Sequence, residues 1–244
     1  ENNDQERIYG NAPTALSTSM KMDLQEVEDA TRMQYTTADF SYDDKVFNEK
    51  VIFVDPGFMD MFTFPLKSGS TDALKHKDRI VLSENAAKKY FGNSDPIDKQ
   101  VTLLFNIDGK DYLQSYFVGA VADKFPYLTS IRFNILVPFE NRKELGFNED
   151  GDWESLTYTF VMLQHAGQAE KVNTQINKYT AVQNESNPDW KINGFILDPL
   201  ESTALNAQGK EAMLAYNAPL VARILLSVIT VFILVLAIFN YVNI

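Results

Sequence analysis

The segment DRIVLSENAAKKYFGNSDPIDK, residues 78–99, holds the residues whose types and spacing come nearest to a site for chemistry. An apolar strand leads into Ser83, and Lys88 and Lys89 follow on a short predicted helix, so an anion could bind at the strand-to-helix turn. A phosphate-binding P-loop also needs glycines around the phosphate and Lys-Ser or Lys-Thr where the helix begins. This segment has neither feature, so we do not predict a phosphate site.

Structural roles explain the same segment better. Ser83 suits the N-cap of the helix, and Glu84 lies at the end where a helix dipole favours negative charge. Gly92 suits the position that ends the helix, while Tyr90 and Phe91 give it a packing face. We therefore interpret the segment as a capped, buried helix.

The other candidates for catalysis or metal binding are weaker. His76 and His165 are the only histidines, and their spacing predicts neither a metal pair nor a catalytic dyad. The carboxylates lie in presumed turns and no pair stands out, and there is no G-x-S-x-G nucleophile motif. The sequence predicts no catalytic, cofactor-binding or metal-binding residue, and therefore no enzyme.

A second structural stretch, KVIFVDPGFMDMF, covers residues 50–62. A strand stops at Asp55 and Pro56, where the aspartate can cap a helix and proline suits its first position. Phe58 and Phe62 then share one face of that helix.

The two ends of the chain predict matching α/β units. At the start, an extended piece at 7–9 precedes a helix at 14–24 and a strand at 27–40. Near the end, a strand at 156–163 precedes apolar residues with helical spacing, and 190–197 resembles a strand with a bulge at Gly194. The helical positions are Ala169, Val172, Ile176 and Tyr179.

The middle of the chain is rich in predicted strands. We therefore predict an α+β fold, in which an α/β subdomain from both chain ends carries an inserted β-rich subdomain and is followed by a transmembrane helix. The predicted ranges are 1–65 and 155–219 for the α/β subdomain, 66–154 for the inserted one, and 220–244 for the helix.

Composition excludes some classes of protein. The net charge is −11 and no basic stripe is visible, which argues against a nucleic-acid partner. The chain has no cysteine, so it has no disulfide, thiol nucleophile or zinc-thiolate site.

The run LLSVITVFILVLAIFNYVNI ends the sequence. The apolar stretch 220–241 would span about 33 Å as a helix, enough to cross a hydrocarbon core of about 30 Å. Pro219 and Arg223 mark its junction with the soluble part, and the arginine can reach the interface. No signal peptide is visible at the start, so the soluble part is either cytosolic and tail-anchored or the sequence is a fragment.

Six motifs, in order, resemble the MacB-like periplasmic domain of FtsX-type ABC transporter permeases, particularly those of Bacteroidetes-type bacteria. They are ERIY, EVEDATRM, VFNEKVIFVDPGFMDMFTFPLKSG, RIVLSENAAKKYFGNSDPIDKQVTL, FVGAVADKFPYLTSIRFNILVPF and AIFNYVNI. The resemblance covers nearly the whole chain, and the order of the motifs with the terminal span makes it specific.

Two positions depart from the family pattern. The turn that begins at Asp95 and Pro96 has Asp98 where the family often has glycine, and aspartate tolerates a left-handed backbone better than most residues. In the family an arginine commonly follows the tyrosine of the first motif, and this chain has Gly10 there. Glycine has no side chain that could form a charge pair near the membrane.

The resemblance implies that the α/β subdomain from both chain ends is porter-like. It also implies a domain between the first two of four spans, with residues 1–219 on the periplasmic side of a bacterial inner membrane. It implies a permease dimer, an ABC ATPase subunit or domain that hydrolyses ATP, and possible contact with a periplasmic adaptor. No cofactor is then expected in this chain. The domain would couple ATP hydrolysis to export or extraction of peptides, lipoproteins, lipids or drugs. Residues with expected structural roles are Asp55, Pro56, Phe58, Phe62, Ser83, Tyr90, Phe91, Asp95 and Pro96.

Two alternatives stay open. The first is an extracytoplasmic ligand-binding or sensor domain of a membrane signalling protein, and the second is a tail-anchored hydrolase. Two further spans after Ile244 would favour the permease, whereas a signalling domain there would favour the sensor.

Overall fold

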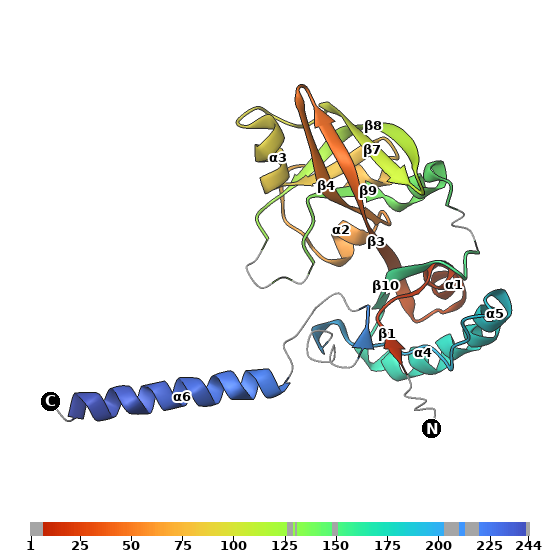
Figure 1. The fold of residues 1–244 in the computed structure, drawn as a ribbon. Coiled ribbons are helices and arrows are strands. Elements are labelled where there is room, and N and C mark those ends of the chain that lie inside the picture. The colour runs from red at the N-terminus through yellow and green to blue at the C-terminus, as the bar shows by residue number, and fades with distance from the viewer. Residues whose placement is uncertain are drawn as a thin grey trace. The chain divides into compact units, whose positions relative to one another are not determined.

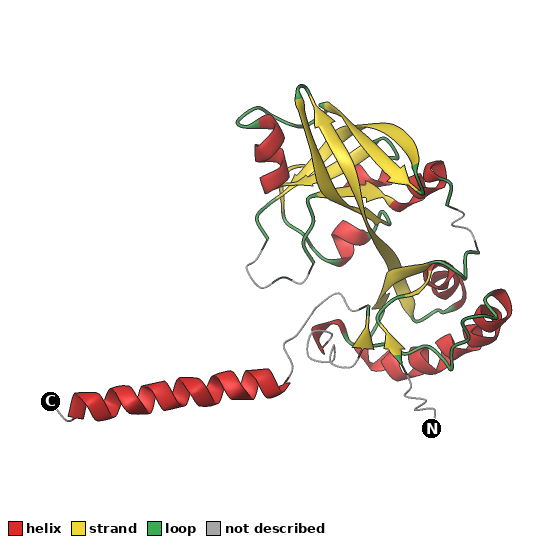
Figure 2. Ribbon diagram, viewed as in Figure 1, coloured by secondary structure: helices red, strands yellow, loops and turns green. Residues whose placement is uncertain are grey.

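The computed structural model describes residues 7–125, 129, 131–147, 151–202, 210–212 and 220–242. The chain divides into two units, and each is described by itself. The larger unit is Asn11–Leu197, and the smaller consists of Glu1–Gly10 together with Asp198–Ile244. Figures 1 and 2 show their helices and strands.

A nine-stranded sheet is the framework of the larger unit. Its strands follow the order β2-β10-β3-β4-β9-β6-β8-β5, and β7 pairs with β3 and β8. The strands are β2 (Ala12–Pro13), β3 (Val27–Tyr42), β4 (Lys45–Val54), β5 (Leu66–Gly69), β6 (Arg79–Ser83), β7 (Gln100–Ile107), β8 (Lys110–Ala122), β9 (Ile135–Pro138) and β10 (Leu156–Leu163).

Short helices connect these strands. The α-helices are α1 (Thr14–Asp23), α2 (Phe58–Met61), α3 (Glu84–Phe91), α4 (Ala169–Gln175) and α5 (Thr180–Ser186). The 3₁₀ helices of this unit are η1 (Thr71–Lys75), η2 (Phe139–Leu145), η3 (Ala166–Gln168) and η4 (Ile176–Tyr179). The observed mixture of helices and strands confirms the predicted α+β class.

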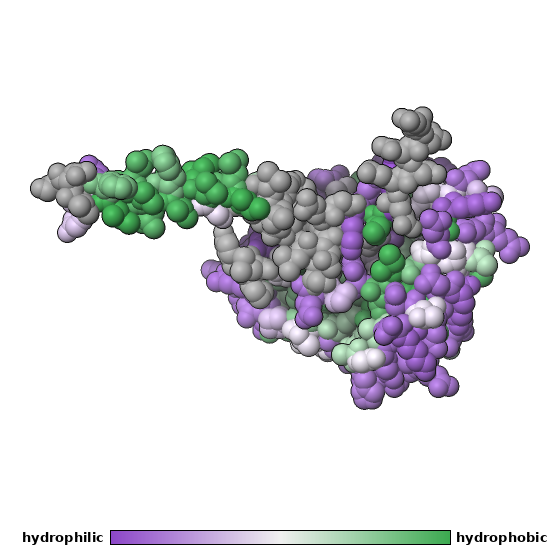
Figure 3. Space-filling view, turned by 90° about the horizontal axis from the view of Figure 1, so that it is seen from below, coloured by the Kyte–Doolittle hydropathy of each residue, from purple (hydrophilic) through white to green (hydrophobic). Residues whose placement is uncertain are grey.

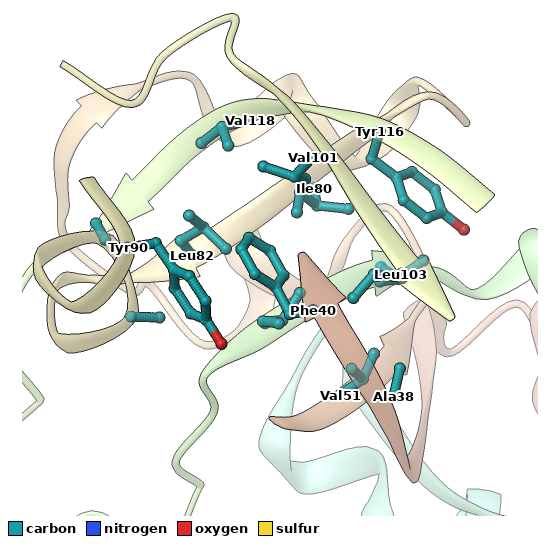
Figure 4. Packing of buried hydrophobic residues seen from close by; sticks show 14 of the residues in the cluster. Ala38, Phe40, Val51, Ile80, Leu82, Tyr90, Val101, Leu103, Tyr116 and Val118 are labelled. Carbon is teal, nitrogen blue, oxygen red and sulfur yellow. The ribbon is translucent and has the colours of Figure 1, made fainter. Parts of the chain in front are cut away.

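Strand β3 contributes to two separate hydrophobic clusters. Its first half packs through Val27 and Ala30 with α1 and with residues of α4 and η4. Its second half packs through Ala38 and Phe40 with residues of α3, β6, β7 and β8, as Figure 4 shows for part of that cluster. One continuous strand therefore contributes buried residues to both clusters.

The smaller cluster joins sequence from both ends of the larger unit. Leu16 and Met20 of α1 pack with Val172, Ile176 and Tyr179, all of them buried. The predicted strands at 27–40 and 156–163 and the helix at 14–24 are confirmed, as is the buried helical spacing from Val172 onwards. A hydrophobic cluster does not define the limits of a domain. The predicted subdomain ranges 1–65, 66–154, 155–219 and 220–244 therefore stay predictions.

Residues 190–197 form no strand, so the predicted strand and its bulge at Gly194 are wrong. Side-chain amides take the place of a strand partner. The amide N–H of Phe195 donates to Asn177 Oδ1 at 2.8 Å, and that of Leu197 donates to Asn173 Oδ1 at 2.7 Å. Because these asparagines satisfy the backbone, the segment packs beside α4 and η4 without joining a sheet.

The smaller unit contains a short ladder and a long apolar helix. Strand β1 (Ile8–Tyr9) pairs in parallel with β11 (Lys210–Glu211), and Gly10 N–H donates to the carbonyl oxygen of Glu211 at 2.9 Å. This unit also contains η5 (Leu200–Ser202) and the 23-residue helix α6 (Leu220–Val242).

Helix α6 has the length and composition of a membrane span. The window Ile224–Tyr241 has a mean hydropathy of 2.6, and none of it is buried. Figure 3 shows apolar surface along this helix. It is the only such helix among the residues that the structure describes.

Candidate functional site

Helix α3 is capped as the sequence predicts. Ser83 Oγ accepts a hydrogen bond from the amide of Ala86 at 3.1 Å, and Gly92 ends the helix with φ of 61°. Tyr90 packs on Phe40 with ring centroids 4.2 Å apart, and Phe91 is buried in the same cluster. The predicted N-cap and packing face are confirmed.

Replacing Ser83 with alanine is expected to lower the free energy of unfolding by about 1 kcal/mol. The change removes a buried acceptor and leaves the Ala86 amide without its capping partner. Chemical denaturation of the variant would measure the loss. Ser94→Ala, at an exposed position, is the matched control; equal effects of the two changes would contradict a capping role.

The lysines of α3 form ion pairs with carboxylates. Glu84 Oε1 lies 2.6 Å from Lys67 Nζ and 3.2 Å from Lys88 Nζ, and the Glu84 side chain is only 8% exposed. Lys89 Nζ lies 2.5 Å from Glu49 Oε1. Ion pairs thus neutralise the positive charges that made this segment a candidate anion site.

Stability should depend on pH through Glu84. Hydrogen bonds from Lys67 and then Lys88 lower the pKa of Glu84 from 4.5 to about 2. A carboxylate whose pKa is lowered by folding stabilises the folded state above its unfolded pKa, and this contribution is lost as pH falls through the folded value. We therefore expect Glu84→Gln to flatten the loss of melting temperature between pH 4.5 and about 2. The exposed Glu28→Gln variant should keep the wild-type pH profile, and matching profiles for all three proteins would contradict the assignment.

Glu49 on β4 is the centre of a buried polar network that the sequence did not indicate. Besides Lys89, its carboxylate accepts hydrogen bonds from Tyr90 Oη at 2.9 Å and Asn134 Nδ2 at 2.7 Å. Burial raises the pKa of Glu49, but the hydrogen bonds outweigh it, so the pKa lies below its ordinary value. Since both carboxylate oxygens of Glu49 have partners, the network holds α3 on the sheet.

Asp55 does not cap α2, so that prediction is wrong. Its carboxylate instead accepts from Arg32 on β3, at 2.9 Å from Nε, 2.7 Å from Nη2 and 2.7 Å from the backbone amide. The guanidinium also lies over the ring of Phe139, with its carbon 3.9 Å from the centroid. A bidentate pair to arginine is stronger than a cap, which explains the preference.

The helix after Asp55 contributes to a chain of phenylalanine rings. Phe58 is fully buried and lies 4.8 Å from Phe62 and 5.7 Å from Phe64, between ring centroids. Phe62 in turn contacts Phe160 of β10 at 4.9 Å. Helix α2 begins at Phe58 with Gly57 as its N-cap, so the prediction that Pro56 takes the first helical position is wrong. Phe58 and Phe62 pack against rings from other elements.

The turn after α3 forms as the sequence indicates. Asp95 Oδ1 accepts from the amide of Ile97 at 3.0 Å, across Pro96. Asp98 has a left-handed φ of 57°, and its carboxylate lies 2.7 Å from Arg79 Nη1. The aspartate in place of glycine therefore keeps the turn and adds an ion pair.

The remaining predicted residues are Pro219 and Arg223 at the membrane junction and the two histidines. Pro219 lies outside the described residues, and Arg223 lies in α6 with its side chain not described. His76 and His165 are both exposed. Among the described residues, no three histidine, aspartate or glutamate side chains gather in a way that could hold a metal.

Apart from Pro219 and Arg223, the predicted residues lie in two neighbourhoods, one around α3 and one around α2. The sequence did not indicate the roles of Arg32 and Glu49. Arg32 pairs with Asp55, 23 residues away in the chain, and Glu49 accepts a hydrogen bond from Tyr90, 41 residues away. Spacing along the sequence gives no signal for such pairs.

Comparison with known families decides what this fold is. Residues 4–179 match the family model described as the MacB-like periplasmic core domain. The chain belongs to this family. A comparison with curated proteins gives no match.

Three solved structures of transporter or permease domains have a similar fold. The extracellular domain of the noncanonic ABC-type transporter YknZ from Gram-positive bacteria is 17% identical, with TM-score 0.55, covering 78% of this chain and 90% of that one. A domain of a putative permease from Porphyromonas gingivalis is 21% identical, with TM-score 0.58, covering 82% and 88%. The periplasmic region of MacB from Actinobacillus actinomycetemcomitans is 16% identical, with TM-score 0.53, covering 77% and 79%.

These findings confirm the predicted resemblance and fold class. The chain is a MacB-like periplasmic core domain followed by a candidate transmembrane helix. Its relatives are named as transporter or permease domains and not as enzymes.

Proposed function

We propose that this chain is the extracytoplasmic domain of an ABC transporter permease, which couples ATP hydrolysis in the cytoplasm to a conformational change outside the inner membrane. The match of residues 4–179 to the MacB-like family carries the proposal. The ATP would bind to a separate or fused nucleotide-binding domain, and the permease would act as a dimer in the export or extraction of peptides, lipoproteins, lipids or drugs. This domain itself would catalyse no reaction.

The smaller unit supports a coupling role. The β1–β11 ladder ties residues 8–9 to residues 210–211, shortly before α6 begins at Leu220. The side chains of Arg7 and Glu211 approach to 3.8 Å beside this ladder. A displacement of the apolar helix would therefore act on both segments together.

Selective labelling tests the location. These 244 residues contain no cysteine, so Ser70→Cys at an exposed position adds a single thiol to them. The complete protein is expressed in its host with any cysteine outside these residues changed to serine. We expect a membrane-impermeant maleimide to label it in intact spheroplasts. Leu74→Cys, which is fully buried, should react only after denaturation. Labelling of the Ser70→Cys variant only after lysis would overturn the proposed location.

Lengthening the link to the membrane tests coupling. Inserting a flexible segment after Ala218 in the complete transporter should reduce transport while ATP hydrolysis continues. Transport equal to that of the wild type would contradict mechanical coupling. A sensor domain predicts instead that the insertion alters a signalling output and no transport.

A further inference from the structure

Strand β8 has an unpaired edge along its first half. It pairs with β7 from Lys110 to Phe117, whereas its parallel pairing with β6 begins only at Phe117, opposite Arg79. Lys77 and Asp78, just before Arg79, form a turn. Among the described residues no strand continues β6 along this edge of β8.

Hydrogen bonds show which backbone groups face the edge. Phe117 N–H donates to the carbonyl oxygen of Asp78 at 2.7 Å, away from β7, while Val118 N–H donates to Lys99 beside β7 at 3.0 Å. The N–H and C=O of a strand residue alternate in direction from one residue to the next. Leu113 and Ser115 therefore direct their N–H and C=O groups toward the same side as Phe117, where no strand pairs with them.

A cavity of about 290 Å³ lies at this edge. Leu113, Ser115, Lys77 and Asp78 line it, together with Asn141 and Glu144 of η2. A water molecule occupies about 30 Å³ in the liquid, so the cavity is larger than the volume that one or two bridging waters would fill.

Asn141 supplies an independent sign of a missing partner. The residue is only 2% exposed, and its Nδ2 donates to the carbonyl oxygen of Lys77 at 2.7 Å. Its Oδ1 is buried and accepts no hydrogen bond from any described residue. A buried amide oxygen without a donor is unfavourable, so the site favours a ligand that brings an N–H group.

The charge and apolar surface of the site indicate the kind of ligand. Asp78 and Glu144 both line the cavity, while the one cation that lines it, Lys77, lies 3.2 Å from Glu140. Leu113 is 71% exposed, and Phe117, on the same face of β8, is 39% exposed. A basic ligand with apolar side chains complements these groups.

We propose that the open edge of β8 binds an extended, basic segment of a partner polypeptide by strand addition. The segment would pair with the backbone of Leu113 and Ser115 and donate an N–H to Asn141 Oδ1, and its lysine or arginine side chains would lie near Asp78 and Glu144. Strand addition combines backbone hydrogen bonds for affinity with side-chain contacts for selectivity. The inference rests on the local geometry and is independent of the proposed transport function.

The test uses the peptide acetyl-Val-Lys-Val-Lys-Val-amide with the full 244-residue chain in detergent micelles. We expect saturable shifts of the Leu113 and Ser115 amide signals and of the Asn141 side-chain signals in NMR spectra. Two versions of the peptide, N-methylated at alternating residues in opposite register, separate strand addition from other binding. The version methylated on the edge facing β8 should bind at least tenfold more weakly, and the other should retain affinity. Equal binding of both versions would overturn strand addition.

Variants of the protein give a second readout. Ser115→Pro removes one N–H from the open edge and should weaken binding at least tenfold, whereas Ser115→Ala keeps that N–H and should bind as the wild type does. Asn141→Leu should also weaken binding. If Ser115→Pro does not fold, the N-methylated peptides decide the question. Equal affinity for acetyl-Val-Glu-Val-Glu-Val-amide would overturn the preference for basic segments, and no binding of the lysine peptide at millimolar concentration would overturn the site.

Discussion

Replacing Asp55 with alanine is expected to lower the free energy of unfolding by about 3 to 5 kcal/mol, because it leaves a largely buried arginine without its partner. The side chains of Arg32 and Asp55 are only 14% and 18% exposed. The carboxylate also accepts the backbone amide of Arg32, so the change leaves a second donor unsatisfied. Denaturant titration followed by circular dichroism would measure the difference.

Two further variants define the cause. Glu28→Ala, at an exposed position on the strand that carries Arg32, should change stability by less than about 0.5 kcal/mol. Arg32→Leu combined with Asp55→Leu removes both charges, and should recover much of the stability that the single change loses. A loss below about 1 kcal/mol for Asp55→Ala would show that the pair adds little to the fold.

Replacing Phe58 with alanine should destabilise the larger unit by about 3 to 5 kcal/mol, since the residue is fully buried between other rings. The loss combines the apolar surface of the ring with the cavity it leaves. A change to leucine fills most of that space and should cost about 1 to 2 kcal/mol. Melting temperatures of both variants, measured by scanning calorimetry, provide the comparison.

Phe117 provides the matched control, because this residue is 39% exposed in the folded chain. Phe117→Ala should lower stability by less than about 1 kcal/mol. If Phe58→Ala proves as mild as Phe117→Ala, then the chain of rings does not stabilise the fold in the way that its packing indicates.

The sequence predicts local structure well where the cause is local. Ser83 caps α3 because the amide it accepts lies three residues ahead, and Gly92 ends the helix with a backbone angle that glycine adopts freely. The buried positions Val172, Ile176 and Tyr179 follow from helical spacing for the same reason.

Distant partners explain where the sequence predictions are wrong. Asp55 has the sequence context of a helix cap, but the guanidinium of Arg32 competes for the same oxygens from a neighbouring strand. Residues 190–197 have the alternation of a strand, but Asn173 and Asn177 satisfy their backbone groups from a helix. The open edge of β8 depends on where β6 begins, which no pattern within β8 encodes.

The shared strand β3 has a consequence for how the larger unit unfolds. Its 16 residues form a wall of both hydrophobic clusters, so neither cluster keeps its lining if the strand detaches. A fragment limited to residues 66–154 would lack Phe40, Val51 and Phe53, which are all buried in the larger cluster. The two clusters of the larger unit should consequently melt in a single calorimetric transition, and proteolysis should not release either of them as a stable piece.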